Sequence, residues 1–429
     1  MIPQKTLFEK SPWLPCEAAS WKHGSIKYFY QIELGRMLQN DPTTSGDIEV
    51  PYLKAQHVQW GSIRIDDLPT MWAAPKEIAI LQVRKGDLLV CEGGEVGRSA
   101  IVQCILPENC IIQNALHLVR GKCGNDVRFL NYLLQNAADY GWFDVLCNRA
   151  TIAHFTVEKF GEIYIALPPI DDQQKIANYL DQETTRINAL IMAKEQLLEL
   201  LTEKRHTLIT RAVISGLNTK ATFRDSGIPW LGRVPTHWET ERAKWLFRER
   251  DERSVTGEEE MLTVSHLTGV TPRSEKEVNM FEAETTEGYK ICHSGDLVIN
   301  TLWAWMGAMG VSRHHGIVSP AYHVYIPGER MDSGYVDALF GIPIFALEAT
   351  RFSKGVWSSR LRLYPEGFFE ILLPVPPLEE QRAIVAYIQS ETSKLDKLSA
   401  SAERTLTLLK ERRSVLIADA VTGKLSIPA

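Results

Sequence analysis

The chain has 429 residues, which allows two to four domains that each bury a core. Its 45% hydrophobic and 23% charged content is ordinary for a globular chain, and no run approaches the roughly 18 apolar residues of a membrane span. The N-terminal Met1-Ile2-Pro3-Gln4-Lys5 lacks an apolar signal core, so we expect a cytoplasmic chain. The net charge of −6 does not indicate a nucleic-acid partner, although a basic surface can coexist with acidic helices.

The first region, residues 1–166, has the pattern of a mixed α/β globule. Short β-type runs lie at 52–58 and 86–90, and a helical stretch follows near 127–138. The segment 92–98 has glycines like those of a phosphate-binding loop, but it lacks the lysine of such a loop and carries glutamates. We therefore predict a hairpin at 92–98.

Residues 167–217 predict one long amphipathic helix. The pair Pro168-Pro169 suits a helix entrance, acidic residues follow in the first turn, and Gly216 suits a helix end. From Asp171 to Ile214 is roughly 44 residues, which at about 1.5 Å per residue gives a length on the order of 65 Å. A single helix with one apolar stripe does not stand alone, so a helix pair within the chain is favoured over an ordinary surface helix.

The second half of the chain repeats the first. The motif at 168–179 returns 208 positions later at 376–387, and Trp21 has a counterpart at Trp238. The divisions of the chain are residues 1–166 and 218–374 for the globular regions, and 167–217 and 375–429 for the helical regions. The predicted fold class is α+β: a tandem duplication of a mixed α/β globule followed by a long helix.

The two helices are predicted to pair as an antiparallel coiled coil with pseudo-twofold symmetry, because two nearly equal units folded head to tail produce such an object. The shared apolar positions step at helical spacing and define the expected seam. The seam residues are Leu180, Ile187, Leu190, Leu201 and Leu208 in the first helix and Ile388, Leu395, Leu398, Leu409 and Leu416 in the second.

No catalytic motif is recognisable. The run Ala-Leu-Pro-Pro-Ile at 166–170 lacks the Asn or Asp of an adenine methyltransferase motif, and no Gly-x-Ser-x-Gly or His-Glu-x-x-His is present. The seven cysteines form no Cys-x-x-Cys, so we expect reduced thiols and no metal site. The sequence therefore predicts no catalytic residues, no metal and no cofactor bound by this chain.

The globular regions instead offer side chains that can read nucleic acid, since Gln and Asn pair with adenine, Arg pairs with guanine, and cations and hydroxyls contact phosphates. For any single residue the alternative is a solvated or internally bonded side chain. In the first region the candidates are Lys54, Gln56, His57, Arg64, Arg98, Gln113, Asn114, Arg149, Thr151 and His154. In the second they are Ser265, His266, Arg273, Trp303, Trp305, Arg313, Ser319, Trp357, Ser358, Arg360 and Arg362.

The layout resembles the specificity subunit of Type I restriction-modification systems. The resemblance rests on Leu-Pro-Pro-Ile-Asp-Asp-Gln at 167–173, Val-Pro-Pro-Leu-Glu-Glu-Gln at 375–381, and Asp-Ser-Gly-Ile-Pro-Trp-Leu-Gly at 225–232. The first copy has two aspartates where the family more often has glutamates. The resemblance covers nearly the whole chain, but it carries over no individual DNA-contact residue.

This resemblance implies a non-catalytic subunit that selects a DNA site for other proteins. Each globular region would be a target-recognition domain for one half of a split double-stranded DNA site, with the helices setting the spacing. Two methyltransferase subunits using S-adenosylmethionine would assemble on the chain, and two restriction subunits using ATP and magnesium could join them. No membrane is implied.

Two other functions compete with this reading. A helical scaffold with two protein-interaction domains would fit the negative charge and the divergence between the globular regions. DNA binding should weaken roughly log-linearly with rising salt, whereas apolar protein docking should not, so salt discriminates between them. A fused restriction enzyme is disfavoured because methyltransferase and nuclease motifs are lacking.

Overall fold

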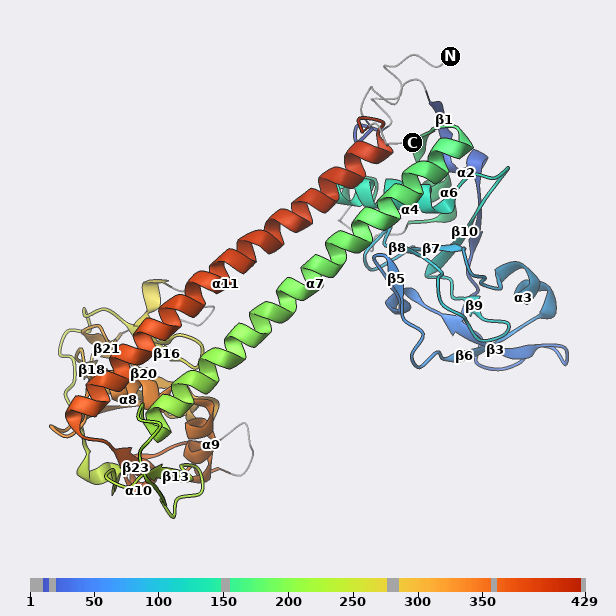
Figure 1. The fold of residues 1–429 in the computed structure, drawn as a ribbon. Helices are drawn as coiled ribbons and strands as arrows, with labels where there is room; N and C mark the ends of the chain where they lie inside the picture. Colours follow the sequence, from blue (N-terminus) through green and yellow to red (C-terminus); the bar gives the residue numbers. More distant parts are fainter. Residues whose placement is uncertain (1–10, 15–20, 148–154, 276–284, 356–360, 426–429) are drawn as a thin grey trace. The chain divides into compact units, whose positions relative to one another are not determined.

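A computed structural model describes residues 11–14, 21–147, 155–275, 285–355 and 361–425. The chain forms two compact units. Unit 1 comprises the residues up to Lys194 together with those from Arg404 onward, and unit 2 comprises Glu195–Glu403. Each unit contains one globular region, which we call head 1 (residues 11–167) and head 2 (residues 218–375), and one end of each long helix (Figure 1).

Head 1 consists of short strands and helices, as the sequence predicts. Its elements are β1 (Lys22–Ser25), α2 (Ile26–Phe29), β2 (Tyr30–Leu34), β3 (Ile48–Leu53), η2 (Ala55–His57), β4 (Val58–Gln59), β5 (Ser62–Ile63), β6 (Thr70–Ala73), α3 (Pro75–Leu81), β7 (Leu88–Cys91), β8 (Ser99–Ile101), β9 (Ile111–Ile112), β10 (Leu116–Gly121), α4 (Val127–Asp139), α5 (Trp142–Leu146), α6 (Val157–Glu162) and β11 (Tyr164–Leu167). The hairpin predicted at 92–98 is confirmed, because β7 and β8 on either side of it pair antiparallel.

Head 2 has an equivalent set. Its elements are β12 (Phe223–Asp225), β13 (Arg233–Pro235), β14 (Glu239–Arg242), η3 (Ala243–Trp245), β15 (Phe247–Glu249), β16 (Leu262–Ser265), β17 (Gly269–Pro272), η4 (Arg273–Glu275), β18 (Lys290–Cys292), β19 (Leu297–Asn300), η5 (Ala304–Met306), β20 (Met309–Val311), β21 (Gly316–Val318), β22 (Tyr322–Pro327), α8 (Ser333–Phe340), α9 (Pro343–Arg351), α10 (Pro365–Glu370) and β23 (Leu372–Val375).

The central sheets of the two heads have the same topology. Head 1 contains a four-stranded antiparallel sheet of order β2-β10-β7-β8, and head 2 contains one of order β15-β22-β19-β20. In both, a strand that precedes the central sheet pairs with the last strand of the head, as β1 with β11 and β14 with β23. The duplication seen in the sequence is therefore a duplication of structure.

An ion pair with a buried carboxylate occurs in each head. Asp87, next to Gly86 at the entrance to β7, accepts both ends of the Arg120 guanidinium at 2.7–2.8 Å. Asp296, next to Gly295 before β19, accepts from Arg250 at 2.7 and 3.1 Å. Both glycines have positive φ, 92° and 96°, a conformation that an L side chain rarely adopts. The Gly-Asp pair repeated in the sequence thus fixes a turn and a buried carboxylate.

The two long helices are α7 (Ile170–Ser215) and α11 (Leu378–Val421). Helix α7 begins and ends within one residue of the predicted bounds, Asp171 and Ile214. Glycines with positive φ follow each helix: Gly216 at 71° and Gly423 at 78°. A Cβ on Gly216 would lie 3.0 Å from the Trp238 ring, and one on Gly423 would lie 3.1 Å from the Trp21 ring, so the repeated tryptophans pack against the two helix ends.

The helices run antiparallel where they meet inside each unit. In unit 1 the core contains Ile176 and Leu180 of α7 with Ile417 and Val421 of α11, and further along α7 Asn188 accepts from Arg413 at 2.8 Å. The partner number falls as the α7 number rises, which defines antiparallel pairing.

Unit 2 repeats this pairing with the helices exchanged. Arg205 of α7 forms an ion pair with Asp396 of α11, and the last turn of α7 packs with Ile384 and Ile388. Arg205 and Arg413 are equivalent positions of the repeat, as are Asn188 and Asp396. The same contact is therefore made twice, as the predicted pseudo-twofold symmetry requires.

The seam prediction is wrong at two positions. Leu190 and Leu398 are 52% and 56% exposed, whereas Ile191 is 7% exposed. Buried or half-buried α7 positions recur at 180, 184, 187, 191, 194, 198, 201, 205 and 208, alternating steps of four and three. From Ile187 the next seam position is thus four residues on, at Ile191, and not three; Ser399 takes this place in α11. The other predicted seam residues, Leu180, Ile187, Leu201, Leu208, Ile388, Leu395, Leu409 and Leu416, are buried or half-buried.

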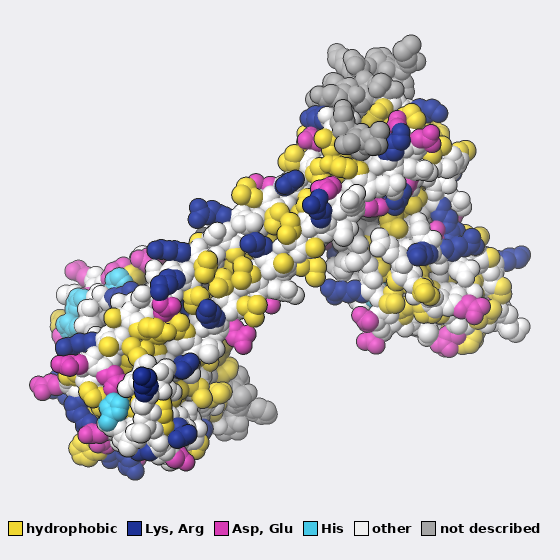
Figure 2. Space-filling model, viewed as in Figure 1, with side chains coloured by type: hydrophobic (Ala, Val, Ile, Leu, Met, Phe, Trp, Pro, Cys, Tyr) yellow, Lys and Arg dark blue, Asp and Glu magenta, His cyan; other side chains and the backbone are white. Residues whose placement is uncertain are grey.

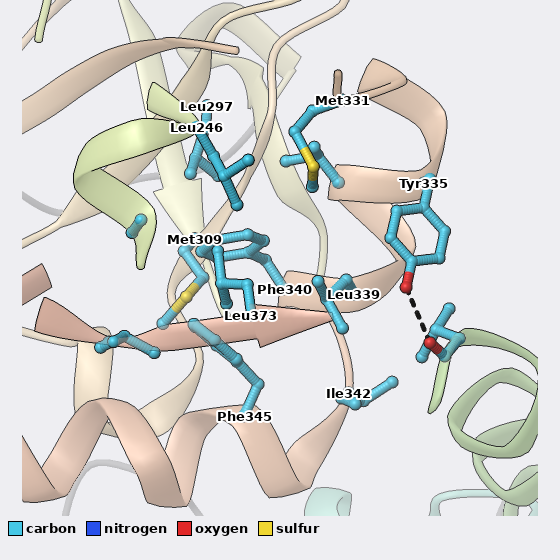
Figure 3. Packing of buried hydrophobic residues seen from close by; sticks show 14 of the residues in the cluster. Leu246, Leu297, Met309, Met331, Tyr335, Leu339, Phe340, Ile342, Phe345 and Leu373 are labelled. Atoms are coloured by element: carbon cyan, nitrogen blue, oxygen red, sulfur yellow. Dashed lines mark hydrogen bonds between the residues drawn. The ribbon is translucent and has the colours of Figure 1, made fainter. Parts of the chain in front are cut away.

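Each head is anchored to the helix ends through its core. In unit 2 the aromatic core around Phe340 and Phe345 extends to the last turn of α7, where the buried Tyr335 hydroxyl donates to the Val213 carbonyl at 2.8 Å (Figure 3). The helical stretch that follows β22 is interrupted, because α8 ends before Gly341 and Pro343 starts α9. Proline cannot continue the hydrogen bonding of a preceding helix.

The glutamine that follows each Pro-Pro pair is hydrogen-bonded to the first turn of a helix in the head. Gln173 is 1% exposed; its side chain accepts from the Asp126 amide at 3.0 Å and donates to the Pro168 carbonyl at 2.9 Å. Gln381 accepts from the Asp332 amide and donates to the Pro376 carbonyl, both at 2.8 Å. Asp126 and Asp332 are the N-caps of α4 and α8. The motif therefore locks each long helix to the first turn of a head helix.

Candidate nucleic-acid interface

In head 1, several loops meet at one end of the central sheet. The loop β7–β8 is joined to the residues before β10 by a bond from the Glu92 amide to the Ala115 carbonyl at 2.9 Å. It is joined to the loop after β3 by Arg98, whose guanidinium donates to the Ala55 carbonyl at 3.0 Å. The Phe155 amide donates to the Glu92 carbonyl at 3.2 Å. We call residues 54–64, 92–98 and 113–115 the head 1 loop cluster.

The head 1 loop cluster gathers candidates that are scattered in the sequence. Gln56 and Arg64 are exposed, and Lys54, Gln113 and Asn114 are half-buried. The backbones of Gln113 and Asn114 are held by bonds to Leu53 and Arg36, both at 2.9 Å, so these two amide side chains stand on a fixed backbone. Their contact with DNA remains a prediction.

Two candidates of head 1, His57 and Arg98, bond to groups within the loops. His57 is 4% exposed, and its Nδ1 accepts from the Lys54 amide at 3.1 Å; burial lowers the pKa of this imidazole. The prediction of a DNA contact is therefore corrected for His57, because the η2 turn directs its ring inward. Arg98 is largely covered, and it also pairs with Glu95 at 3.0 Å, so it braces the hairpin.

In head 2, loops meet at the equivalent end of the sheet. Asn300, the last residue of β19, lies opposite Tyr322 and donates to the Val264 carbonyl of β16 at 3.4 Å. The Leu363 amide donates to the Thr301 carbonyl at 3.2 Å. We call residues 265–269, 300–308, 319–322 and 361–363 the head 2 loop cluster. The bond at Leu363 is the counterpart of the bond at Phe155 in head 1.

Most described candidates of head 2 belong to this cluster. His266, Trp303 and Arg362 are exposed, and Ser265, Trp305 and Ser319 are half-buried. Arg273 directly follows β17, at the end of the β16–β17 hairpin away from its turn. Its positive charge nevertheless interacts with the Tyr322 hydroxyl. Burial raises the pKa of the Tyr322 hydroxyl, and the Arg273 cation acts in the opposite direction.

Arg313 lies outside the head 2 loop cluster, at the other end of the sheet. It follows β20 at the end of the sheet where Leu297 pairs with Val311, which is opposite to the end formed by Asn300 and Tyr322. Its charge acts on Asp337 of α8. The prediction that Arg313 contacts DNA together with the other candidates is therefore corrected, because the length of β20 separates it from the loop cluster.

Six candidates lie outside the described residues. They are Arg149, Thr151, His154, Trp357, Ser358 and Arg360.

Sequence reasoning missed residues that complete the clusters. In head 1, Trp60 of the β4–β5 turn donates from its indole nitrogen to Glu95 at 2.5 Å. In head 2, Asn300 and Tyr322 form the last residue pair between β19 and β22. A signal for Asn300 existed in the sequence, because a polar residue directly follows the buried apolar run of β19.

The clusters present amides, hydroxyls, cations and indole rings, which suit base edges, phosphates and base faces. Within the described part of the chain, no three His, Cys, Asp or Glu side chains are grouped so that they could hold a metal ion. No helix in those same residues is long and apolar enough to cross a membrane.

Comparisons with known proteins agree with this geometry. Residues 19–200 match the family model of the Type I restriction modification DNA specificity domain. A chain solved in work on complex assembly and conformational transition of the type I R-M system aligns with a TM-score of 0.72 at 17% identity, over 96% of this chain and 99% of its own. The HsdS subunit from Thermoanaerobacter tengcongensis aligns with a TM-score of 0.54 at 16% identity, over 94% and 97%. At such identities the likeness concerns the fold. Comparison with curated protein sequences gives no match.

Two heads of one topology, each with a loop cluster suited to nucleic acid, define a DNA-recognition protein built as a tandem repeat. The family model identifies the kind of recognition. Residues 19–200 thus match a Type I restriction modification DNA specificity domain, and the fold of the whole chain is similar to that of the HsdS subunit. The helical-scaffold alternative is not favoured.

Proposed function

We propose that this chain selects the site at which a Type I complex methylates DNA. Each head reads one half of a bipartite sequence through its loop cluster, and α7 and α11 set the distance between the halves. The complex would act on DNA in the cytoplasm. The proposal rests on one observation: both heads join the same loops at the same end of the same sheet, yet with different side chains. A duplicated frame with divergent loops suits two different half-sites.

Partner subunits would dock on the outer faces of the long helices. Leu190 and Leu398, equivalent positions of the repeat, are 52% and 56% exposed, and the equivalent Leu200 and Leu408 are 61% and 64% exposed. Unit 1 presents Leu190 with Leu408, and unit 2 presents Leu398 with Leu200. Figure 2 displays hydrophobic side chains along these helices among Lys and Arg. Two equal apolar sites suit two copies of one partner.

These partners would supply the chemistry. Two methyltransferase subunits would use S-adenosylmethionine to methylate adenine, and two restriction subunits would use ATP and magnesium. This chain would then bind no cofactor of its own.

The test alters one head at a time. We would map N6-methyladenine in cells that carry the partner methyltransferase and either a Gln113→Ala, Asn114→Ala chain or a His266→Ala, Arg362→Ala chain. The first pair should relax or change one half of the methylated motif, and the second pair the other half, because each pair lies in a different loop cluster. A change of the same half by both pairs, or of both halves by each pair, would contradict the assignment of one half-site to each head.

A further inference from the structure

Head 2 exposes a large aromatic side chain at the tip of its loop cluster. Trp303 is 49% exposed, and its neighbour Leu302 is 37% exposed. On the adjacent turn, Leu267 is 80% exposed. That turn leads into β17, whose first residue lies against β20, because a Cβ on Gly310 would lie 3.5 Å from the Gly269 Cα. Apolar side chains thus stand out from a cluster that otherwise presents polar groups.

The backbone beneath Trp303 is rigid. The Trp303 amide donates to the Asn300 carbonyl at 3.0 Å, and its own carbonyl accepts from the amides of Met306 and Ala308 at 2.9 and 3.1 Å. The Trp305 ring lies nearly parallel to the Trp303 ring, with 6.2 Å between centroids, and its nitrogen donates to the Leu302 carbonyl at 3.0 Å. The loop also packs on α9, where a Cβ on Gly307 would lie 3.6 Å from Ala346. The indole of Trp303 is therefore presented in a fixed position.

Cations border this aromatic tip. Arg362 and Lys354 are exposed and bonded to each other through their backbones at 2.9 Å. The neighbouring Leu363 is bonded to Thr301 of the tryptophan loop. An aromatic ring flanked by Lys and Arg suits a base face beside phosphates, whereas an apolar protein partner would gain little from these charges.

We propose that Trp303, supported by Trp305, is a wedge that stacks on a nucleobase at one step of the half-site read by head 2, opening that step. The inference rests on the proposed function and adds a specificity-determining residue to it. Because stacking opens a base step, sites with an easily unstacked step at that position would be preferred.

Head 1 reads its half-site by different means. The equivalent loop, 92–98, carries glutamates and glycines and no aromatic residue. Trp60, an indole of the same loop cluster, is bonded to Glu95. We therefore assign the wedge to head 2.

Trp245 provides a matched control. It is also in head 2 and is 70% exposed, but it precedes β15, whose first residue Phe247 pairs with Pro327 at the end of the sheet opposite to Asn300. Trp245→Ala removes the same side chain from a surface outside the loop cluster.

The experiment uses the full chain with its partner methyltransferase and a duplex carrying the methylated motif. 2-Aminopurine is placed at each position of the half-site assigned to head 2. With the unchanged chain, fluorescence should rise at one step. With Trp303→Ala that rise should disappear and affinity should fall about 10- to 100-fold, as the loss of one stacked base predicts. Trp303→Phe should keep most of the fluorescence rise and most of the affinity. Trp245→Ala should behave as the unchanged chain.

Two outcomes would overturn the inference in different ways. Equal affinity and equal fluorescence for Trp303→Ala and the unchanged chain would remove the wedge and leave the proposed function standing. Failure of the unchanged complex to bind the duplex even at low salt would remove the proposed function as well. Trp303→Phe and the thermal midpoint of each variant separate a lost contact from a lost fold.

Discussion

At the scale of single residues, the most informative finding concerns the glutamine of the repeated Pro-Pro motif. A polar residue that recurs at the start of both helices could have been a partner contact. Gln173 and Gln381 are instead buried and saturate the amide and carbonyl groups between a long helix and a head helix. Buried polar groups are costly when left unpaired, so these side chains are structural.

Replacing Gln173 with leucine should therefore destabilise the chain. The change leaves the Asp126 amide and the Pro168 carbonyl without their partner, which should lower the free energy of unfolding by about 2–3 kcal/mol. Urea denaturation of the full chain measures it. Gln174→Leu is the matched control, since Gln174 is adjacent and exposed, and should change stability by less than about 0.5 kcal/mol. Equal effects of the two variants would refute the structural role.

A second residue couples head 1 to pH. Hydrogen bonds from the Thr44 hydroxyl and the Thr43 amide hold the pKa of Asp47 below its usual range. A depressed carboxyl pKa contributes stability that is complete above the unfolded value of about 4 and is lost as pH falls below it. Asp47→Asn should reduce the loss of stability below about pH 4, measured by thermal midpoints across the acid range. The exposed Asp41, altered to Asn in the same loop, should leave that loss unchanged.

At the scale of elements, the helix pair was the part of the fold best predicted from sequence. Its period and its exact duplication constrain it, whereas the heads are built from short strands that pair across large sequence separations. No local pattern links β1 with β11, or reveals that β3 and β9 lie parallel. The candidate side chains were identified by type, but their meeting at one sheet end depends on that topology.

The misassigned seam positions have a similar cause. Residues 190 and 191 are both apolar, and Leu190 is the one that the repeat preserves as Leu398. Preservation between the copies favours Leu190 as the seam residue. The alternating three- and four-residue steps of the structure place Ile191 inside instead, so the preserved leucines face outward.

This assignment predicts a contrast between adjacent residues. Ile191→Ala should lower the free energy of unfolding by about 2–4 kcal/mol, because it leaves a cavity in the seam. Leu190→Ala should change it by less than about 0.5 kcal/mol but should weaken binding of the partner methyltransferase. Chemical denaturation and a pull-down with that partner measure the two effects. A larger loss of stability for Leu190→Ala would restore the original seam.

At the scale of the whole molecule, the repeat unifies the account. The same sheet order, the same glutamine lock, the same buried Gly-Asp turn and the same helix contact each occur twice. The two copies differ more in their heads than in their long helices, so the same frame carries two different sets of exposed side chains. A protein of this construction is suited to select two DNA sequences at a defined separation.

If the helices set that separation, lengthening them should lengthen the spacer. Inserting four residues in each helix adds about one turn, or ~6 Å, and a four-residue insertion is absorbed by local unwinding of a coiled coil. The spacer of the methylated motif should grow by about one to two base pairs of ~3.4 Å, with both half-sites unchanged. Methylation mapping would detect it, and an unaltered spacer in a folded, active variant would exclude the ruler role.

The central claim is that this chain chooses the methylated sequence. It is tested most directly by a genome-wide map of N6-methyladenine in cells with and without the gene, with the partner methyltransferase present in both. We predict that a two-part motif with a fixed gap loses methylation when the gene is deleted. An identical set of methylated motifs in the two strains, with the methyltransferase shown to be active, would contradict the account.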